Sequence, residues 1–91
     1  MGLHPYLLLE TVLSDEKALY EMRNREIMYD LEKAIMKLEE PYRSVVKEHI
    51  IDSKTAKEIS EERNIGIKTI QTQIYRAKEI LKTSLRREVE I

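Results

Sequence analysis

Apolar residues recur at intervals of three or four along most of the chain, which is the spacing of one face of an α-helix. In the segment at residues 14–38, Ser14 is the predicted N-cap, and a polar run at residues 23–26 interrupts the apolar stripe. We therefore expect either one long helix or two helices with a joint near Asn24. The stripe consists of Ala18, Leu19, Met22, Ile27, Leu31, Ala34, Ile35 and Leu38.

The next helix is expected to have Pro41 in its first turn, because a proline loses no hydrogen bond there. A turn at residues 52–54 should end it, and Thr55 then suits the N-cap of a short helix over Ala56–Arg63. The inward residues of the short helix would be Ala56, Ile59 and Ser60. The apolar face of the helix after Pro41 consists of Tyr42, Val45, Val46, His49 and Ile50.

Asn64, Ile65 and Gly66 predict a tight turn, since asparagine and glycine tolerate the left-handed backbone conformation. The last helix should run from near Ile67 to about Glu88, and its residues 70, 74, 77 and 81 share one face. The opposite face carries side chains of the kinds that contact base edges and phosphates in a major groove. They are Lys68, Gln71, Thr72, Tyr75 and Arg76.

A short helix, a tight turn and a longer helix with a polar, basic outer face form a helix-turn-helix. Thr55, at the start of the short helix, could hold a phosphate, and Lys54 and Lys57 could reach neighbouring ones. The predicted fold is all-α, a small helical bundle with a helix-turn-helix and an additional N-terminal helix. The residues expected to clamp the two helices together are Ile59, Ile65, Ile70 and Ile74.

The composition excludes several classes of protein. With 91 residues the chain makes one small domain, and with only two glycines and two prolines an all-β fold is excluded. The absence of cysteine excludes disulfides and thiolate zinc sites, and the longest apolar run, residues 6–9, is too short to span a membrane. We therefore expect a cytoplasmic protein that does not bind membranes.

The net charge of −1 conceals an asymmetry between the two parts of the chain. Residues 1–52 carry seven Lys and Arg against eleven Asp and Glu, whereas residues 53–91 carry nine against six. The stretch from Ile67 to Arg87 has six basic residues and one acid, Glu79. An acidic first half and a basic last helix indicate one surface for protein and one for nucleic acid, unless the basic face is merely solvated.

Three stretches of the chain carry a recognisable pattern: Leu38-x4-Arg43-x-Val45-Val46, Lys57-Glu58-Ile59-Ser60, and Ile65-x3-Thr69-Ile70-x3-Ile74-x-Arg76-Ala77-x3-Leu81. From about Leu31 to Ser84 the chain resembles region 4 of the bacterial sigma-70 family of RNA polymerase sigma factors. The resemblance is strongest to the sporulation sigma-H and extracytoplasmic-function groups. Residues that depart from the family pattern are Arg63 (usually apolar), Asn64 (usually Gly), Ser53 (commonly Gly) and the displaced Pro41.

The resemblance implies that the last helix reads the minus-35 promoter element in the major groove. It also implies that the earlier helices bind the flap of the polymerase β subunit, with the acidic first half and the stripe of Tyr42, Val46 and Ile50 as candidates. Anti-sigma factors of the family bind in the same place. The expected DNA-binding residues are Thr55, Lys57, Lys68, Thr69, Gln71, Thr72, Tyr75 and Arg76.

By the same resemblance, residues 26–88 would form the region 4 domain, residues 1–25 an interdomain linker helix and residues 89–91 a tail. Promoter melting in the family uses an upstream domain rich in aromatic residues, and this chain has no Trp and no Phe. We expect it to be the C-terminal domain of a longer protein, with a small independent regulator as the alternative. The apolar residues 6–9, Val12 and Leu13 would pack either on this chain or on a neighbour.

Two other functions remain open. One is a response-regulator type of helix-turn-helix effector domain, which would bind DNA as a dimer. The other is a helical protein-interaction module whose basic last helix is solvated. The carboxylates are scattered and His4 and His49 are far apart, so we expect no catalysis, metal or cofactor, and His49 should be packed or half-exposed.

Overall fold

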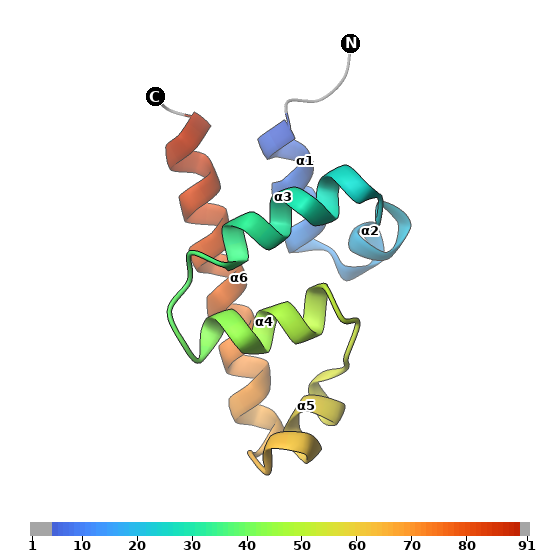
Figure 1. Cartoon of the computed structure of the whole chain (residues 1–91), viewed down its shortest axis with the longest axis vertical. Helices are drawn as coiled ribbons and strands as arrows, with labels where there is room; N and C mark the ends of the chain where they lie inside the picture. Colours follow the sequence, from blue (N-terminus) through green and yellow to red (C-terminus); the bar gives the residue numbers. More distant parts are fainter. Residues whose placement is uncertain (1–4, 90–91) are drawn as a thin grey trace.

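The computed structural model describes the backbone of residues 5–89 and the side chains of residues 9–85. This part of the chain contains six helices and no strands, which confirms the all-α prediction (Figure 1). The helices are α1 (Pro5–Ser14), α2 (Glu16–Glu21), α3 (Arg25–Ile35), α4 (Tyr42–Ile50), α5 (Ala56–Arg63) and α6 (Ile67–Val89).

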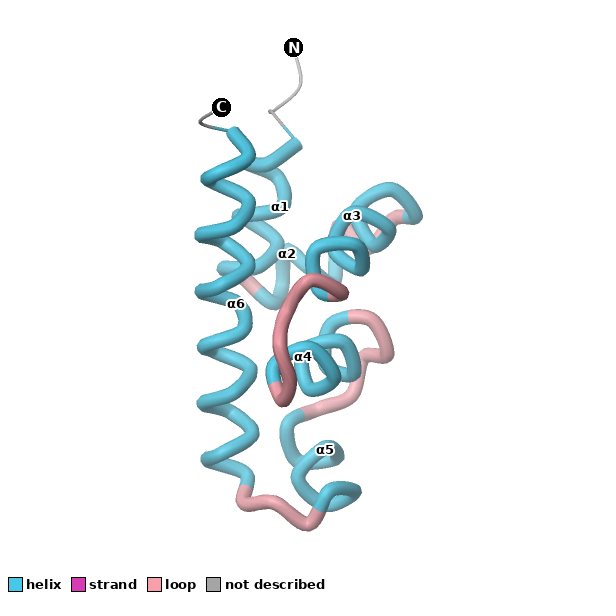
Figure 2. The backbone as a smooth tube through the Cα atoms, turned by 60° about the vertical axis from the view of Figure 1, so that its left-hand side comes forward, coloured by secondary structure: helices cyan, strands magenta, loops and turns pink. Residues whose placement is uncertain are grey.

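The long helix α6 runs the length of the molecule, and α1, α3, α4 and α5 pack along it (Figures 1 and 2). Helix α1 lies beside the C-terminal half of α6, whereas α4 and α5 contact its N-terminal half. Helix α5 and the start of α6 therefore form one end of the molecule, and the described ends of the chain lie at the other. The described chain extends 45 × 26 × 18 Å.

Side-chain caps fix where α2 and α3 begin. The Asp15 carboxylate accepts from the Lys17 N–H at 2.9 Å, so Asp15 caps α2 and the predicted cap, Ser14, is the last residue of α1. Asn24 Oδ1 accepts from the Ile27 N–H at 2.9 Å, and the predicted joint near Asn24 therefore separates two helices. Pro41 stands one residue before its predicted position, because α4 begins at Tyr42.

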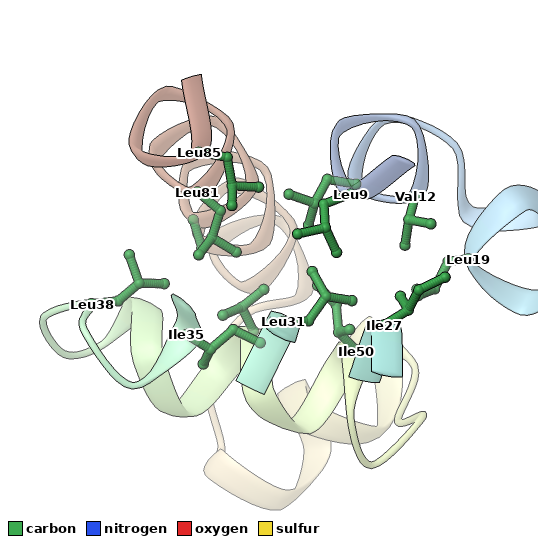
Figure 3. Packing of buried hydrophobic residues seen from close by; sticks show 13 residues of the cluster. Leu9, Val12, Leu19, Ile27, Leu31, Ile35, Leu38, Ile50, Leu81 and Leu85 are labelled. Carbon is green, nitrogen blue, oxygen red and sulfur yellow. The ribbon is translucent and has the colours of Figure 1, made fainter. Parts of the chain in front are cut away.

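The larger of two hydrophobic clusters joins α1 to the rest of the domain (Figure 3). Leu9, Val12 and Leu13 of α1 are buried in it, so these residues pack on this chain rather than on a neighbour. Leu31 and Leu81 lie in the same cluster and are fully buried. The side chains of residues 6–8 lie outside the described ones, as does His4.

Polar contacts fasten the α2 region to α4 and α6, and the sequence pattern did not indicate them. Arg23 donates to the carbonyl oxygens of Ile50 and Ile51 at 2.6 and 2.9 Å, and so caps the C-terminal end of α4. The Glu16 carboxylate accepts from Lys78 Nζ at 3.2 Å and lies 2.8 Å from His49 Nε2. The hydrogen bond with His49 lowers the pKa of Glu16, and Lys78 adds to the effect.

Candidate nucleic-acid interface

The smaller hydrophobic cluster holds α4, α5 and α6 together at the end of the molecule that carries the helix-turn-helix. Ile59 and Ile70 are fully buried in it, and Ile74 is nearly so, which confirms three of the four expected clamp residues. The prediction that Ile65 is the fourth clamp residue is wrong, because 37% of its surface is exposed. The turn displaces Ile65 outward, and Val45 of α4 occupies the cluster instead.

The turn between α5 and α6 consists of residues 64–66 and depends on Asn64. Asn64 has φ 54° and ψ 45°, the left-handed conformation that asparagine tolerates better than most residues. The Ile65 N–H donates to the Ser60 carbonyl at 3.1 Å, and the Ser60 hydroxyl donates to the Ile65 carbonyl. Gly66 does not use its expected conformational freedom, because its φ is not positive. The turn therefore requires a permissive residue at position 64 alone.

Helix α6 presents two opposite faces. Ile70, Ile74, Ala77 and Leu81 are buried, as their spacing predicted. The predicted outer face is exposed, and none of its side chains has a hydrogen bond or ion pair within the described part of the chain. These exposed residues are Lys68, Gln71, Thr72, Tyr75 and Arg76, and Thr69, which was also expected to bind DNA, is exposed beside them.

The start of α6 suits an anionic partner. The first turn contains no acidic residue, and Gly66, which precedes it, has no side chain that could cap the helix. The N–H groups of the first turn therefore keep their positive partial charge, to which Lys68 adds a full charge. A phosphate approaching this end of the molecule meets donors and positive charge.

Thr55 and Lys57 lie on or next to α5, at the same end of the molecule as the start of α6 (Figure 1). Thr55 forms a capping box, in which its Oγ1 accepts from the Glu58 N–H and Glu58 Oε1 accepts from the Thr55 N–H, both at 3.1 Å. This hydrogen bond from the Thr55 backbone lowers the pKa of Glu58. The Thr55 hydroxyl proton is left to donate to a phosphate, and Lys57 is exposed.

Lys54 belongs to a charge network at the surface that joins the α4–α5 loop to both helices. Its Nζ lies 2.8 Å from Glu62 and 3.1 Å from Glu48, and these two partners raise its pKa, Glu62 more than Glu48. Arg63 Nε donates to the same Glu48 carboxylate at 3.1 Å. Arg63 therefore forms an ion pair between α5 and α4 at a position where the resemblance described above implied an apolar side chain.

An open hollow of about 300 Å³ adjoins the outer face of α6. The expected residues Lys68, Thr69, Thr72 and Arg76 line one side of it. Pro41, Tyr42 and Gln73 also line it, and the sequence pattern did not indicate them. Gln73 falls between the two faces of α6, which is the signal that could have found it, and its Oε1 is buried without a hydrogen-bond partner.

The structure also corrects the prediction that Tyr42, Val46 and Ile50 form a stripe that contacts the polymerase flap. Val46 and Ile50 are fully buried against the core, and Tyr42 is partly buried. Val46 and Ile50 therefore cannot meet a partner without unfolding the domain, whereas Tyr42 remains partly accessible beside the hollow. The apolar periodicity of α4 reports the core of this chain and not a docking surface.

The geometry of α5, the turn and α6 is that of a DNA-binding helix-turn-helix domain. The family model of sigma-70, region 4, matches residues 28–81, and the chain belongs to this family. Its members are DNA-binding domains rather than enzymes. No solved structure and no curated protein matches the chain significantly.

The matched residues begin within α3 and end within α6, so α1 and α2 precede them. None of the helices in the described part of the chain is long and apolar enough to cross a membrane. Over the same residues, no three His, Asp or Glu side chains come together as a metal site would require.

Proposed function

We propose that this domain reads the minus-35 element of a promoter through the outer face of α6, as part of a sigma factor of the sporulation sigma-H or extracytoplasmic-function type. One observation carries the proposal: a row of exposed cationic, amide and hydroxyl side chains lies opposite a fully buried face of the same helix. Side chains without internal partners are available to bind base edges and phosphates.

The chemistry of this face matches that of a major groove. Gln71 can pair with adenine through the carbonyl oxygen and the N–H₂ group of its side-chain amide, and Lys68 can reach guanine or a phosphate. Thr72 and Tyr75 add hydroxyl groups and apolar surface for thymine methyl groups. Thr55 and Lys57 would contact the backbone beside the groove and so fix the register of the domain.

Because Val46 and Ile50 of α4 are buried, we propose that the exposed side of α3 contacts the polymerase β flap instead. Tyr29 and Met36 are 60% and 56% exposed, and their spacing of seven residues places them on one face of the helix and its C-terminal extension. Lys33 lies between them, 5.4 Å from the centre of the Tyr29 ring. An anti-sigma factor that covered this face would compete with the flap.

Met36→Lys should weaken binding of a flap peptide and leave DNA binding unchanged, whereas unchanged flap binding would reject this surface.

The same proposal treats residues 26–88 as the functional unit and residues 1–25 as the connection to the upstream part of a longer sigma factor. Residues 89–91 would be a tail. In that protein the docked α1 would bring the connection against the C-terminal half of α6 (Figure 2).

The proposal is tested by selecting binding sequences from a library of random duplexes at low salt. Fluorescence anisotropy then compares the selected duplex with a scrambled one across a range of salt concentrations. We expect the selected duplex to bind more tightly, with affinity falling as salt rises by a slope of about −0.9 for each phosphate contacted. Gln71→Ala should cost about 1 to 3 kcal/mol and relax the preference at one base pair.

Lys17→Ala is a matched control for Lys68→Ala, because Lys17 is exposed on α2, far from the start of α6 (Figure 1). Lys68→Ala should weaken binding and Lys17→Ala should not. If wild type shows no salt-dependent binding to any duplex, the proposed function is wrong and the solvated-face interpretation stands.

A further inference from the structure

The outer face of α6 is divided into two parallel stripes. Gln71 and Tyr75 are four residues apart and form one stripe, whereas Thr69, Gln73 and Arg76 form another at intervals of four and three. The second stripe lies on the flank that adjoins the start of α4, where the hollow is. Arg76 therefore lines a cavity between two helices, whereas Gln71 and Tyr75 do not.

The hollow is positively charged and rich in donors. Two cationic side chains, Lys68 and Arg76, line it together with three residues that carry hydroxyl groups, and no acidic residue does. The acidic residue nearest in sequence to the lining residues is Glu40, which precedes Pro41. Its carboxylate already accepts from the Ser44 N–H at 2.7 Å and lies 3.9 Å from Arg43 Nε. Neither cation of the hollow has an ion-pair partner in the described part of the chain.

The remaining lining residues complete a site for an oxyanion. Tyr42 contributes a phenol from α4, and Thr69 and Thr72 contribute hydroxyl groups from α6. Gln73 also lines the hollow, and the N–H₂ group of its carboxamide is a further neutral donor. Cations and neutral donors together on the α6 wall, with the Tyr42 phenol on the α4 wall, match the oxygens of a phosphodiester and not the edge of a base.

We propose that this hollow binds one backbone phosphate of the DNA strand that flanks the bases read by Gln71 and Tyr75. Arg76 is then a phosphate contact that positions the domain, rather than a residue that reads sequence. The inference rests on the proposed function and adds a division of labour to it, with one stripe of α6 for bases and the other for the backbone.

Arg76→Ala separates these roles in the anisotropy assay. We expect it to weaken the selected duplex and its single-base variants by the same factor, and to reduce the salt slope by about one unit. Gln71→Ala should do the reverse, with an altered base preference and an unchanged salt slope. Arg25→Ala is the matched control, because Arg25 is exposed at the start of α3 without a side-chain partner, and it should change neither quantity.

Single neutral methylphosphonates placed along each strand locate the phosphate. At one position, the methylphosphonate should weaken duplex binding by the wild-type protein but should have little further effect on duplex binding by the Arg76→Ala or Thr69→Val variant. The inference is overturned if Arg76→Ala alters preference at one base pair while keeping the full salt slope, or if no methylphosphonate position is coupled to it. Wild type that binds no duplex at all refutes the proposed function, which is a different result.

Discussion

At the scale of single residues, Arg63 shows how this chain accommodates a charge where an apolar side chain is usual. Its guanidinium pairs with Glu48 of α4, and Lys54 shares the same carboxylate. Glu48→Gln should lower the free energy of unfolding by about 1 kcal/mol, a typical value for a partly exposed ion pair. Urea denaturation measures the change. Glu79→Gln, which removes an ion pair within α6, is the control and should cost less than about 0.5 kcal/mol.

The pKa of Glu48 makes this contribution dependent on pH. Burial opposes its ionisation, but hydrogen bonds from Arg63 and Lys54 outweigh burial and hold the pKa below the ordinary value of 4.5. The stabilisation is therefore complete above that pH and is lost as the pH falls through the lowered pKa of the folded state. We expect a smaller acid-induced loss of stability in Glu48→Gln than in wild type, measured as the urea midpoint between about pH 6 and about pH 3. Equal losses in the two proteins would contradict the assignment.

Asn64 and Gly66 of the turn differ in backbone conformation. Asn64 is left-handed, so Asn64→Val should cost about 1 to 2 kcal/mol because of its β-branched side chain. Gly66 is not left-handed, and a Cβ added there meets no atom within 4 Å. Gly66→Ala should therefore be neutral or stabilise by up to about 1 kcal/mol. Thermal unfolding of both variants checks the pair, and the opposite order would show that the turn is wrongly described.

At the scale of elements, the sequence predicted α5, its Thr55 cap and the two faces of α6, because local capping and periodicity determine them. It misplaced the cap of α2, since Ser14 and Asp15 are adjacent and both can cap a helix. It also placed Ile65 in the core, because periodicity does not show how far a turn displaces a side chain. The hollow beside α6 could not be predicted, since it forms between α6 and a helix that begins 25 residues earlier in the chain.

The two faces of α6 can be tested with one substitution at two positions. Ile70→Asp should unfold the domain, because Ile70 is fully buried and an unpaired buried charge costs several kcal/mol. The free energy of unfolding of a small domain is only about 5 to 15 kcal/mol. Ile80→Asp places the same charge on the same helix at a side chain that is 41% exposed, and should leave the fold intact. Circular dichroism distinguishes them, and a folded Ile70→Asp would refute the buried face.

At the scale of the whole molecule, α1 shares its core with α3, α4 and α6. The chain should therefore unfold in one cooperative transition, with α1 included. Leu13→Ala should cost about 2 to 5 kcal/mol, as buried leucines do, and shift that single transition. A tyrosine fluorescence transition that does not coincide with the loss of helix, or an unchanged midpoint in Leu13→Ala, would show that α1 is only loosely attached. This packing was left open by the sequence because it depends on tertiary contacts.

The central claim is that the outer face of α6 meets DNA while the rest of the domain stays free. Nuclear magnetic resonance tests it most directly, by mapping the backbone amide shifts that change when the selected duplex is added at low salt. The account predicts the largest changes at Lys68, Gln71, Thr72 and Arg76 and along α5, with α1 and α2 unaffected. Changes concentrated on α2 and α3, with the start of α6 unperturbed, would contradict it.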